Sequence, residues 1–178
     1  KSIFIYDVAK HDKQRLVQEQ ECADIIVFQC PWSEGILHAA ELIKSKGKRK
    51  VVIEIDDNLF NVDPWNEKYN MFGLYNRHII ISAKEVETQK RFLDEVKQYD
   101  WIRKQYSRDG SLILDMWRDG YRDFNIEENK KKSLATKKLL NICDLVTVTT
   151  KELGKQLRKI APKTRMAVLP NFIDLSRF

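Results

Sequence analysis

The chain has 178 residues, of which 43% are hydrophobic and 33% are charged, and its formal net charge is +6. This length and composition suit a globular protein with a hydrophobic core of its own. They do not suit a nucleic-acid-binding protein, which would concentrate more basic side chains on one face. No apolar run approaches the roughly 18 residues that cross a bilayer, so we expect a cytoplasmic protein.

The cysteines are an odd number, Cys22, Cys30 and Cys143, and none of them stands in a CxxC pair. This spacing excludes a zinc site and a disulfide framework. We expect reduced, buried thiols, as is usual in a cytosolic protein.

Strand and helix patterns alternate at the start of the chain. Residues 2–8 and 23–29 are apolar enough for two strands, with a polar, helical stretch at 10–22 between them. Ser33 is a good N-cap for a helix over residues 34–46, and the spacing of its apolar residues gives that helix one apolar face. Gly47 supplies its C-cap.

The next strand ends in acidic residues. The run from Val51 to Ile55 is short and nearly all apolar, which predicts a strand buried on both faces. Open parallel sheets bind ligands at the carboxyl ends of their strands. Asp56 and Asp57 are therefore candidate catalytic residues, and Asn58 is a candidate substrate-binding residue.

The acid pair has two interpretations. Neighbouring carboxylates repel each other, so a protein retains such a pair more readily when a cation, sugar hydroxyls or helix N-termini offset the repulsion. Alternatively, Asp57 or Asn58 forms an Asx turn that caps the next segment.

The middle of the chain is predicted to be an insertion. Residues 61–83 are aromatic and lack a period, which indicates a loop or lid suited to a ring-shaped ligand, or else a satellite hydrophobic cluster. Residues 84–142 are predicted to be helical throughout, divided at Asp109-Gly110 and Asp119-Gly120. Trp101 and Trp117 are candidate anchors in this region. The end of this region is rich in lysine: Lys130, Lys131, Lys132, Lys137 and Lys138. These lysines form either a phosphate-binding surface or a solvated helix face.

The last part returns to alternating strand and helix. Residues 144–149 and 166–169 are strands, and a capping box from Thr149 to Glu152 opens the helix between them. Thr149 and Asn171 follow strand ends, so both are candidate substrate-binding residues. The predicted fold is α/β, a Rossmann-like parallel sheet flanked by helices, with a long helical insertion at about 84–142.

Four segments in this order resemble the amino-terminal half of GT-B glycosyltransferases of the glycosyltransferase-4-like kind, in the bacterial and phage group. The segments are residues 23–29, 51–60 with the acidic strand end, 143–150 with Leu153, and 168–174 with Pro170-Asn171. Cys30 departs from this pattern, because an Arg is common at its position.

The resemblance implies that residues 1–178 form a single Rossmann-like domain with an insertion at about 61–138, on the acceptor side of the cleft. The nucleotide-sugar donor would be held mainly by a carboxy-terminal domain outside these residues, without a metal or other cofactor. The acceptor would be a glycan, a lipid-linked molecule or a protein, with peripheral contact between the lysine-rich helix and anionic lipid headgroups. We expect these residues to fold alone, to transfer no sugar and to bind the donor more weakly than about 10 μM.

Two other function classes fit parts of the sequence. In a receiver-like or phosphotransfer domain, Asp56 and Asp57 would hold Mg²⁺. Such a domain is expected to carry a Lys at the end of its last strand, where this chain has Pro170-Asn171. In a non-catalytic scaffold, residues 84–138 would be the binding arm.

Overall fold

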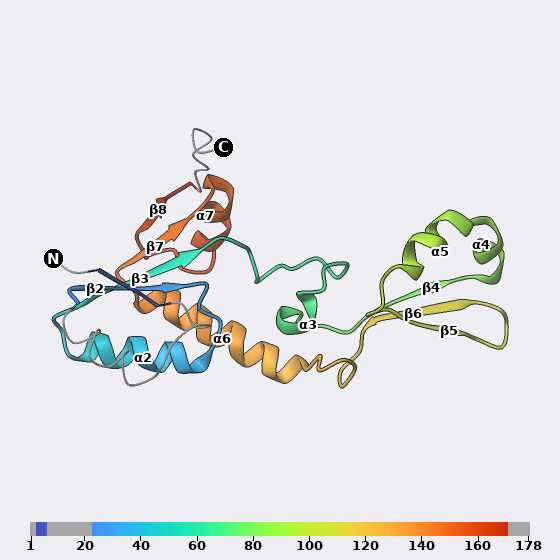
Figure 1. Cartoon of the computed structure of the whole chain (residues 1–178), viewed down its shortest axis with the longest axis horizontal. Coiled ribbons are helices and arrows are strands. Elements are labelled where there is room, and N and C mark those ends of the chain that lie inside the picture. Colours follow the sequence, from blue (N-terminus) through green and yellow to red (C-terminus); the bar gives the residue numbers. More distant parts are fainter. Residues whose placement is uncertain (1–2, 7–22, 171–178) are drawn as a thin grey trace, which may run out of the picture. The chain divides into compact units, whose positions relative to one another are not determined.

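The computed structural model describes residues 3–6 and 23–170, the first of these ranges by its backbone alone. The chain divides into two compact units (Figure 1). The sheet unit comprises Lys1–Asn58 and Lys131–Phe178, and the inserted unit comprises Leu59–Lys130.

The sheet unit is built on a five-stranded parallel sheet in the order β1-β2-β3-β7-β8. Its strands are β1 (Ile3–Tyr6), β2 (Ile25–Gln29), β3 (Lys50–Ile55), β7 (Leu145–Val148) and β8 (Met166–Val168). Its helices are α2 (Glu34–Ser45), α6 (Ile126–Ile142), which begins in the inserted unit, and α7 (Lys151–Arg158). The predicted Rossmann-like α/β fold, a parallel sheet flanked by helices, is confirmed.

Helix α2 follows its sequence signals closely. The Ser33 hydroxyl accepts a hydrogen bond from the backbone N–H of Ile36, and the predicted apolar face, Ile36, Ala40 and Ile43, is buried. Gly47, just past the helix, has a φ of +71°, a left-handed conformation that glycine adopts without strain. Local signals and burial therefore agree along the whole helix.

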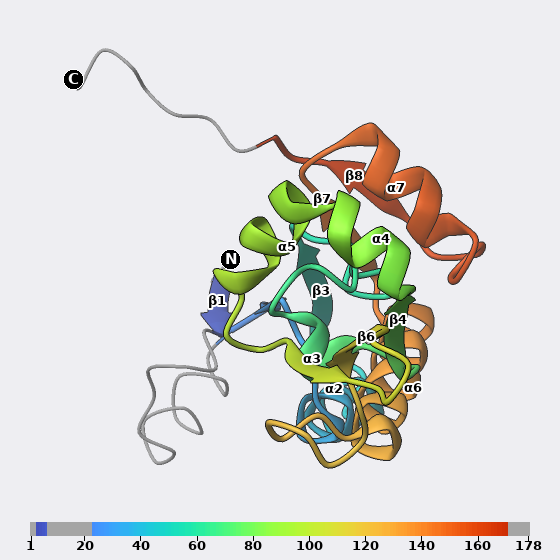
Figure 2. The same ribbon diagram turned by 90° about the vertical axis from the view of Figure 1, so that its right-hand side faces the viewer.

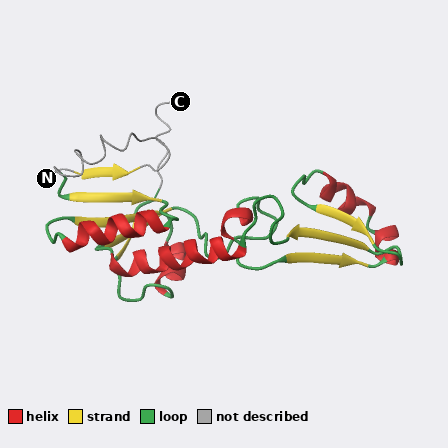
Figure 3. Cartoon of the chain, turned by 90° about the horizontal axis from the view of Figure 1, so that it is seen from below, coloured by secondary structure: helices red, strands yellow, loops and turns green. Residues whose placement is uncertain are grey.

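The prediction that β3 is buried on both faces is wrong. Phe28, Ile53 and Val146 pair across three strands on one fully buried face, whereas Val52 on the other face is half-buried. Helices α2 and α6 lie side by side on one face of the sheet (Figure 3), and α7 lies alongside β7 and β8 (Figure 2). Right-handed crossovers between strands that follow chain order place successive helices on the same face.

The inserted unit contains a three-stranded antiparallel sheet in the order β4-β6-β5. Its strands are β4 (Arg77–Ile81), β5 (Arg103–Tyr106) and β6 (Leu112–Trp117), and its helices are α3 (Tyr69–Phe72), α4 (Ala83–Thr88) and α5 (Lys90–Lys97). The prediction that residues 84–142 are helical throughout is therefore wrong, because β5 and β6 lie within that range. The loop or lid predicted at 61–83 is likewise replaced in part by α3 and β4.

The physical reason lies in the hairpin between β5 and β6. Asp109-Gly110 is its turn, where Gly110 has a φ of +83° and the Ser107 N–H donates to the Ser111 carbonyl. In β6, Leu112, Leu114 and Met116 alternate as buried residues. All four side chains of β5 are exposed, so this edge strand has no apolar alternation by which to recognise it.

Aromatic side chains dominate the core of the inserted unit. The Tyr69 ring stacks on Trp117 and on Phe124, with centroids 5.8 Å apart in both pairs. Trp117 is only 2% exposed and its indole N–H donates to the Pro64 carbonyl at 2.7 Å. Trp117 is thus a core residue, and the prediction that it anchors a surface is wrong. The alternative of a hydrophobic cluster within residues 61–83 is confirmed by Tyr69, Val62, Trp65 and Ile81.

Candidate functional site

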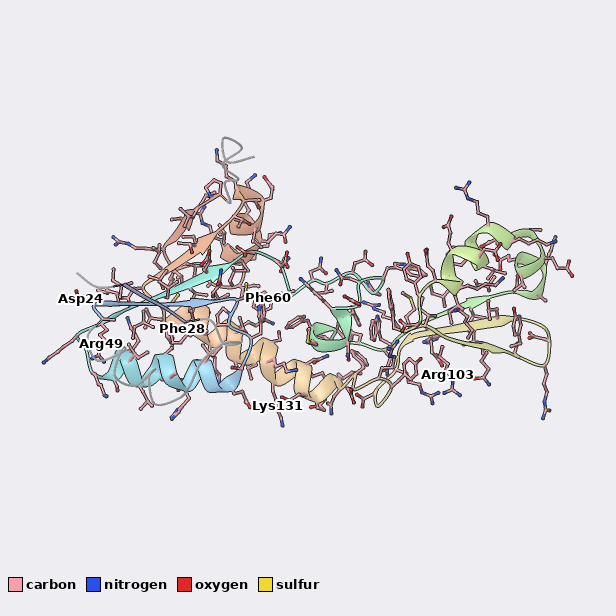
Figure 4. The ribbon with its side chains drawn as sticks, in the orientation of Figure 1. Asp24, Phe28, Arg49, Phe60, Arg103 and Lys131 are labelled. Carbon is pink, nitrogen blue, oxygen red and sulfur yellow. The ribbon has the colours of Figure 1, made fainter. Side chains whose placement is uncertain are left out.

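The carboxyl edge of the parallel sheet brings two of the predicted site residues together. Asp56 directly follows β3 and Thr149 directly follows β7, and the last residues of these strands, Ile55 and Val148, are paired. The Thr149 hydroxyl donates to the backbone carbonyl of Asp56 at 3.3 Å. We call this region, Asp56, Asp57 and Thr149, the acidic edge. Asp24 lies at the opposite end of the strands (Figure 4).

Asp56 is the central residue of the acidic edge. Its side chain is half-buried, and its Oδ1 atom is buried without a hydrogen-bond partner among the residues that the structure describes. Buried carboxylate oxygens are almost always paired, because desolvation without a partner is costly. An unpaired oxygen at the carboxyl end of a central strand therefore indicates a place where a ligand would donate a hydrogen bond. Asp57, the second predicted catalytic residue, is exposed.

Thr149 is available to the site because another residue caps the following helix. The sequence predicts a capping box that begins at Thr149, but the N-cap of α7 is Thr150, whose hydroxyl accepts from the Leu153 N–H at 3.1 Å. This part of the prediction is wrong by one residue. The Thr149 hydroxyl is consequently free of the helix and fixes the backbone of Asp56 instead.

Asn58 has a structural partner within the sheet unit. Its amide nitrogen donates to the side-chain oxygen of Gln156 on α7. This bond ties the end of the acidic segment to the helix that follows β7. The fifth predicted site residue, Asn171, lies outside the described residues.

Two neighbours of the acidic edge, Glu54 and Cys30, are not among the predicted site residues, although Cys30 stands out in the sequence as a departure from the GT-B pattern. The Cys30 N–H donates to the Glu54 carbonyl at 2.9 Å, and Cys30 has a φ of +45°, a left-handed conformation that is uncommon outside glycine. The register of Gln29 with Glu54 places both residues at the same end of the sheet. The signal in the sequence is position: Cys30 directly follows β2, and Glu54 is the next-to-last residue of β3, two residues before Asp56.

The charges of this edge act on one another. Burial raises the pKa of Glu54, and the nearby charge of Asp56 raises it further. Burial also raises the pKa of Cys30, although its backbone hydrogen bond with Asp56 acts in the opposite direction. The acidic edge therefore favours protonated side chains around Asp56 and disfavours the approach of another anion.

The edge is not a prebuilt metal centre. Across residues 23–170, where side chains are described, no group of three or more His, Cys, Asp and Glu residues is arranged to hold a metal ion.

Among the helices of the described part of the chain, none combines the length and apolarity needed to span a membrane. A cavity of about 460 Å³ lies in the inserted unit, and its lining shares no residue with the acidic edge.

Comparison with known proteins adds little. No family model matches the chain, and no curated protein matches it. The crystal structure of pyruvate kinase from Pyrobaculum aerophilum is similar with a TM-score of 0.41 and 12% identity, over 94% of this chain and 44% of that one. The chain thus spans less than half of that structure, and similarity at this level supports no statement about activity.

Proposed function

We propose that the chain is the acceptor-side part of a glycosyltransferase that uses a nucleoside diphosphate sugar. The observation that carries the proposal is the buried Oδ1 of Asp56, which lacks a partner among the described residues at the carboxyl end of a central strand. The hydroxyl of an acceptor is a donor of the size and polarity that this oxygen requires. The sequence resemblance to GT-B enzymes supports the same reaction class.

In the proposed reaction, Asp56 accepts a hydrogen bond from the acceptor hydroxyl and orients it toward the donor. The acceptor oxygen forms a bond to the anomeric carbon, and the bond from that carbon to the diphosphate oxygen breaks. The nucleoside diphosphate leaves with the electron pair, and the hydroxyl proton passes to a carboxylate or to solvent. Thr149 positions Asp56 through its 3.3 Å bond to the Asp56 carbonyl.

The proposed partners follow from the charge of the site. The negatively charged diphosphate is not attracted to a region that carries the acidic residues Glu54, Asp56 and Asp57. The donor is therefore held mainly by a second domain, as in GT-B enzymes. The acceptor is a glycan, a lipid-linked molecule or a protein. For a membrane-bound acceptor, the exposed Lys131 and Lys138 of α6 supply the contact with anionic headgroups, at about 1 kcal/mol per side chain.

The test is an assay of the natural-length protein with a panel of nucleoside diphosphate sugars, measuring release of the nucleoside diphosphate. We expect release from one class of donor, and we expect it to survive chelation of divalent cations. The 178-residue chain alone is expected to release none and to bind donors more weakly than about 10 μM.

Three outcomes would contradict the proposal. Absence of release from every donor would favour a non-catalytic scaffold. Labelling of Asp56 or Asp57 by an acyl phosphate donor in the presence of Mg²⁺ would favour the receiver-like alternative. Measurable transfer by the 178-residue chain alone would show that these residues are not only the acceptor side.

A further inference from the structure

The inserted unit contains a cavity of about 460 Å³, within the size range of small-molecule sites. It is lined by Asn70 and its neighbours on and before α3, by Asp100 and Trp101 before β5, by Trp117 at the end of β6, and by Arg122. All of these residues belong to the inserted unit. The cavity is therefore a feature of this unit by itself, independent of the acidic edge.

Two atoms of residues that line this cavity are buried and lack hydrogen-bond partners within the described part of the chain. They are the indole nitrogen of Trp101 and the side-chain oxygen of Asn70. One is a donor and the other is an acceptor. A hydroxyl-bearing ligand satisfies both, since each hydroxyl group donates one hydrogen bond and accepts others.

The aromatic side chains that line the cavity are held in place by their own packing. Trp117 is fixed by its 2.7 Å hydrogen bond to the Pro64 carbonyl and by the stacked Tyr69 ring. Trp101 packs on Tyr99 with ring centroids 4.8 Å apart. Trp117 is buried and supports the wall of the cavity, whereas the half-buried ring of Trp101 is the one that can contact the apolar C–H face of a sugar, at little cost in side-chain entropy.

The charged side chains around the cavity balance. Glu67 and Asp100 are acidic, Lys68 and Arg122 are basic, and Arg122 lies 3.2 Å from Asp100 in an exposed ion pair. A site built for a phosphate would carry an excess of basic groups. Arg122 also has a φ of +49°, a left-handed conformation that is uncommon outside glycine and clusters at binding sites.

From the cavity, the two unpartnered atoms, the rigid ring of Trp101 and the balanced charge, we infer that the inserted unit binds a neutral saccharide of one or two rings. The indole N–H of Trp101 donates to a sugar oxygen, and the side-chain oxygen of Asn70 accepts from a sugar hydroxyl. This site does not depend on the function proposed for the acidic edge.

The experiment observes the four tryptophan indole N–H signals of the ¹⁵N-labelled chain by NMR. The probes are the methyl glycosides of glucose, galactose, mannose, N-acetylglucosamine and rhamnose, with maltose and cellobiose, each added to tens of millimolar. At least one saccharide is expected to shift the Trp101 signal downfield, as a new hydrogen bond does, and to leave the Trp65 signal in place. Trp101→Phe identifies the signal by removing it.

Variants separate a binding site from a packing defect. Trp101→Phe keeps an aromatic ring and removes the donor, and Asn70→Ala removes the acceptor, so each is expected to weaken saccharide binding about five- to tenfold. Trp65→Phe is the matched control, because Trp65 packs on Phe92 and Tyr99 but does not line the cavity. It is expected to leave binding unchanged.

The inference is overturned if no saccharide of the panel shifts the Trp101 signal. It is also overturned if Trp101→Phe and Asn70→Ala bind as the parent chain does, or if adenosine or uridine binds this cavity more tightly than every saccharide. Asp56→Asn is expected to leave the saccharide titration unchanged. An experiment that rejects the function proposed for the acidic edge would therefore leave the saccharide site untouched, and the reverse also holds.

Discussion

The ammonium of Lys44 lies 2.8 Å from Oδ2 of Asp144 and joins the last turn of α2 to the residue before β7. The same Oδ2 accepts the backbone N–H of Val51 at 2.9 Å, and Lys50 lies 3.1 Å from the other oxygen. One carboxylate therefore connects α2, β3 and β7 at the amino end of the parallel sheet. The two ends of the sheet therefore differ, because at the carboxyl end the Oδ1 of Asp56 has no hydrogen-bond partner among the described residues.

Asp144→Asn is expected to lower the free energy of unfolding by about 1–3 kcal/mol at pH 7, because it removes charge-assisted hydrogen bonds. Burial raises the pKa of Asp144, but the hydrogen bonds from Lys44, Val51 and Lys50 outweigh burial and hold the pKa below its ordinary value. The carboxylate thus contributes stability above the unfolded-state pKa, near 4, and loses it as pH falls through the lower folded-state pKa. Urea unfolding of the parent and of Asp144→Asn from pH 7 to pH 3 measures the difference in their free energies of unfolding. If this difference stays constant over the range, the Asp144 carboxylate does not stabilise the fold as described.

Glu54→Gln is expected to change the free energy of unfolding in the opposite direction from Asp144→Asn. The variant should be more stable than the parent at pH 7 by up to about 1 kcal/mol. Burial first and the charge of Asp56 second raise the pKa of Glu54, so folding favours its protonated form. The stability that the protonated Glu54 side chain contributes is fully present below its unfolded-state pKa. This stability is lost as pH rises through the raised folded-state pKa. The two proteins should therefore be equally stable near pH 3. Glu41→Gln, on an exposed position of α2, is the control and should change nothing at either pH.

Cys143 is expected to react with iodoacetamide more slowly than Cys30 at pH 8. Burial, with a smaller effect from the charge of Asp144, raises the pKa of Cys143 to about 11. Only about 0.1% of that thiol is then ionised at pH 8, and the thiolate is the reactive form. Cys30 is exposed. Peptide mass spectrometry over time measures both rates, which should become equal in denaturant. Faster labelling of Cys143 in the folded chain would be inconsistent with its burial.

Gly73→Ala is expected to destabilise the inserted unit by about 1–3 kcal/mol through overpacking. A methyl group at this position would overlap the ring of Tyr69, which cannot move aside because it is buried and stacked on Trp117. Gly35→Ala is the matched control, since the nearest atom to its methyl group would be the Ser33 hydroxyl oxygen at 3.9 Å. Hydrogen exchange should show lost protection in β4 and β6 for the first variant and none for the second. Equal protection in both variants would contradict this packing.

The elements that sequence reasoning predicted well are those whose signals are local. The cap at Ser33, the apolar spacing of α2 and the glycine at Gly47 each act within a few residues. Strand β5 could not be predicted, because its exposed polar side chains give no period and its identity as a strand depends on pairing with β6. The interior position of Trp117 likewise depends on Pro64, a residue distant in sequence.

At the acidic edge, too, local signals could be predicted from the sequence and contacts between distant residues could not. Asp56 and Thr149 could be placed together from strand ends alone, because parallel strands end on the same side of a sheet. The shift of the helix cap to Thr150 decides which hydroxyl reaches Asp56, and a Thr-Thr pair in the sequence does not distinguish the two. The contact between Asn58 and Gln156 joins residues 98 apart, which no local pattern encodes.

The central claim, that Asp56 orients the acceptor hydroxyl in sugar transfer, is tested most directly by the kcat of Asp56→Asn in the natural-length protein. The carboxamide keeps the size of the side chain and removes the charge that a reacting hydroxyl needs. We predict a fall in kcat of at least about 100-fold, with unchanged thermal stability and with Glu41→Gln as a fully active control. A kcat for Asp56→Asn within about twofold of the parent would contradict the account.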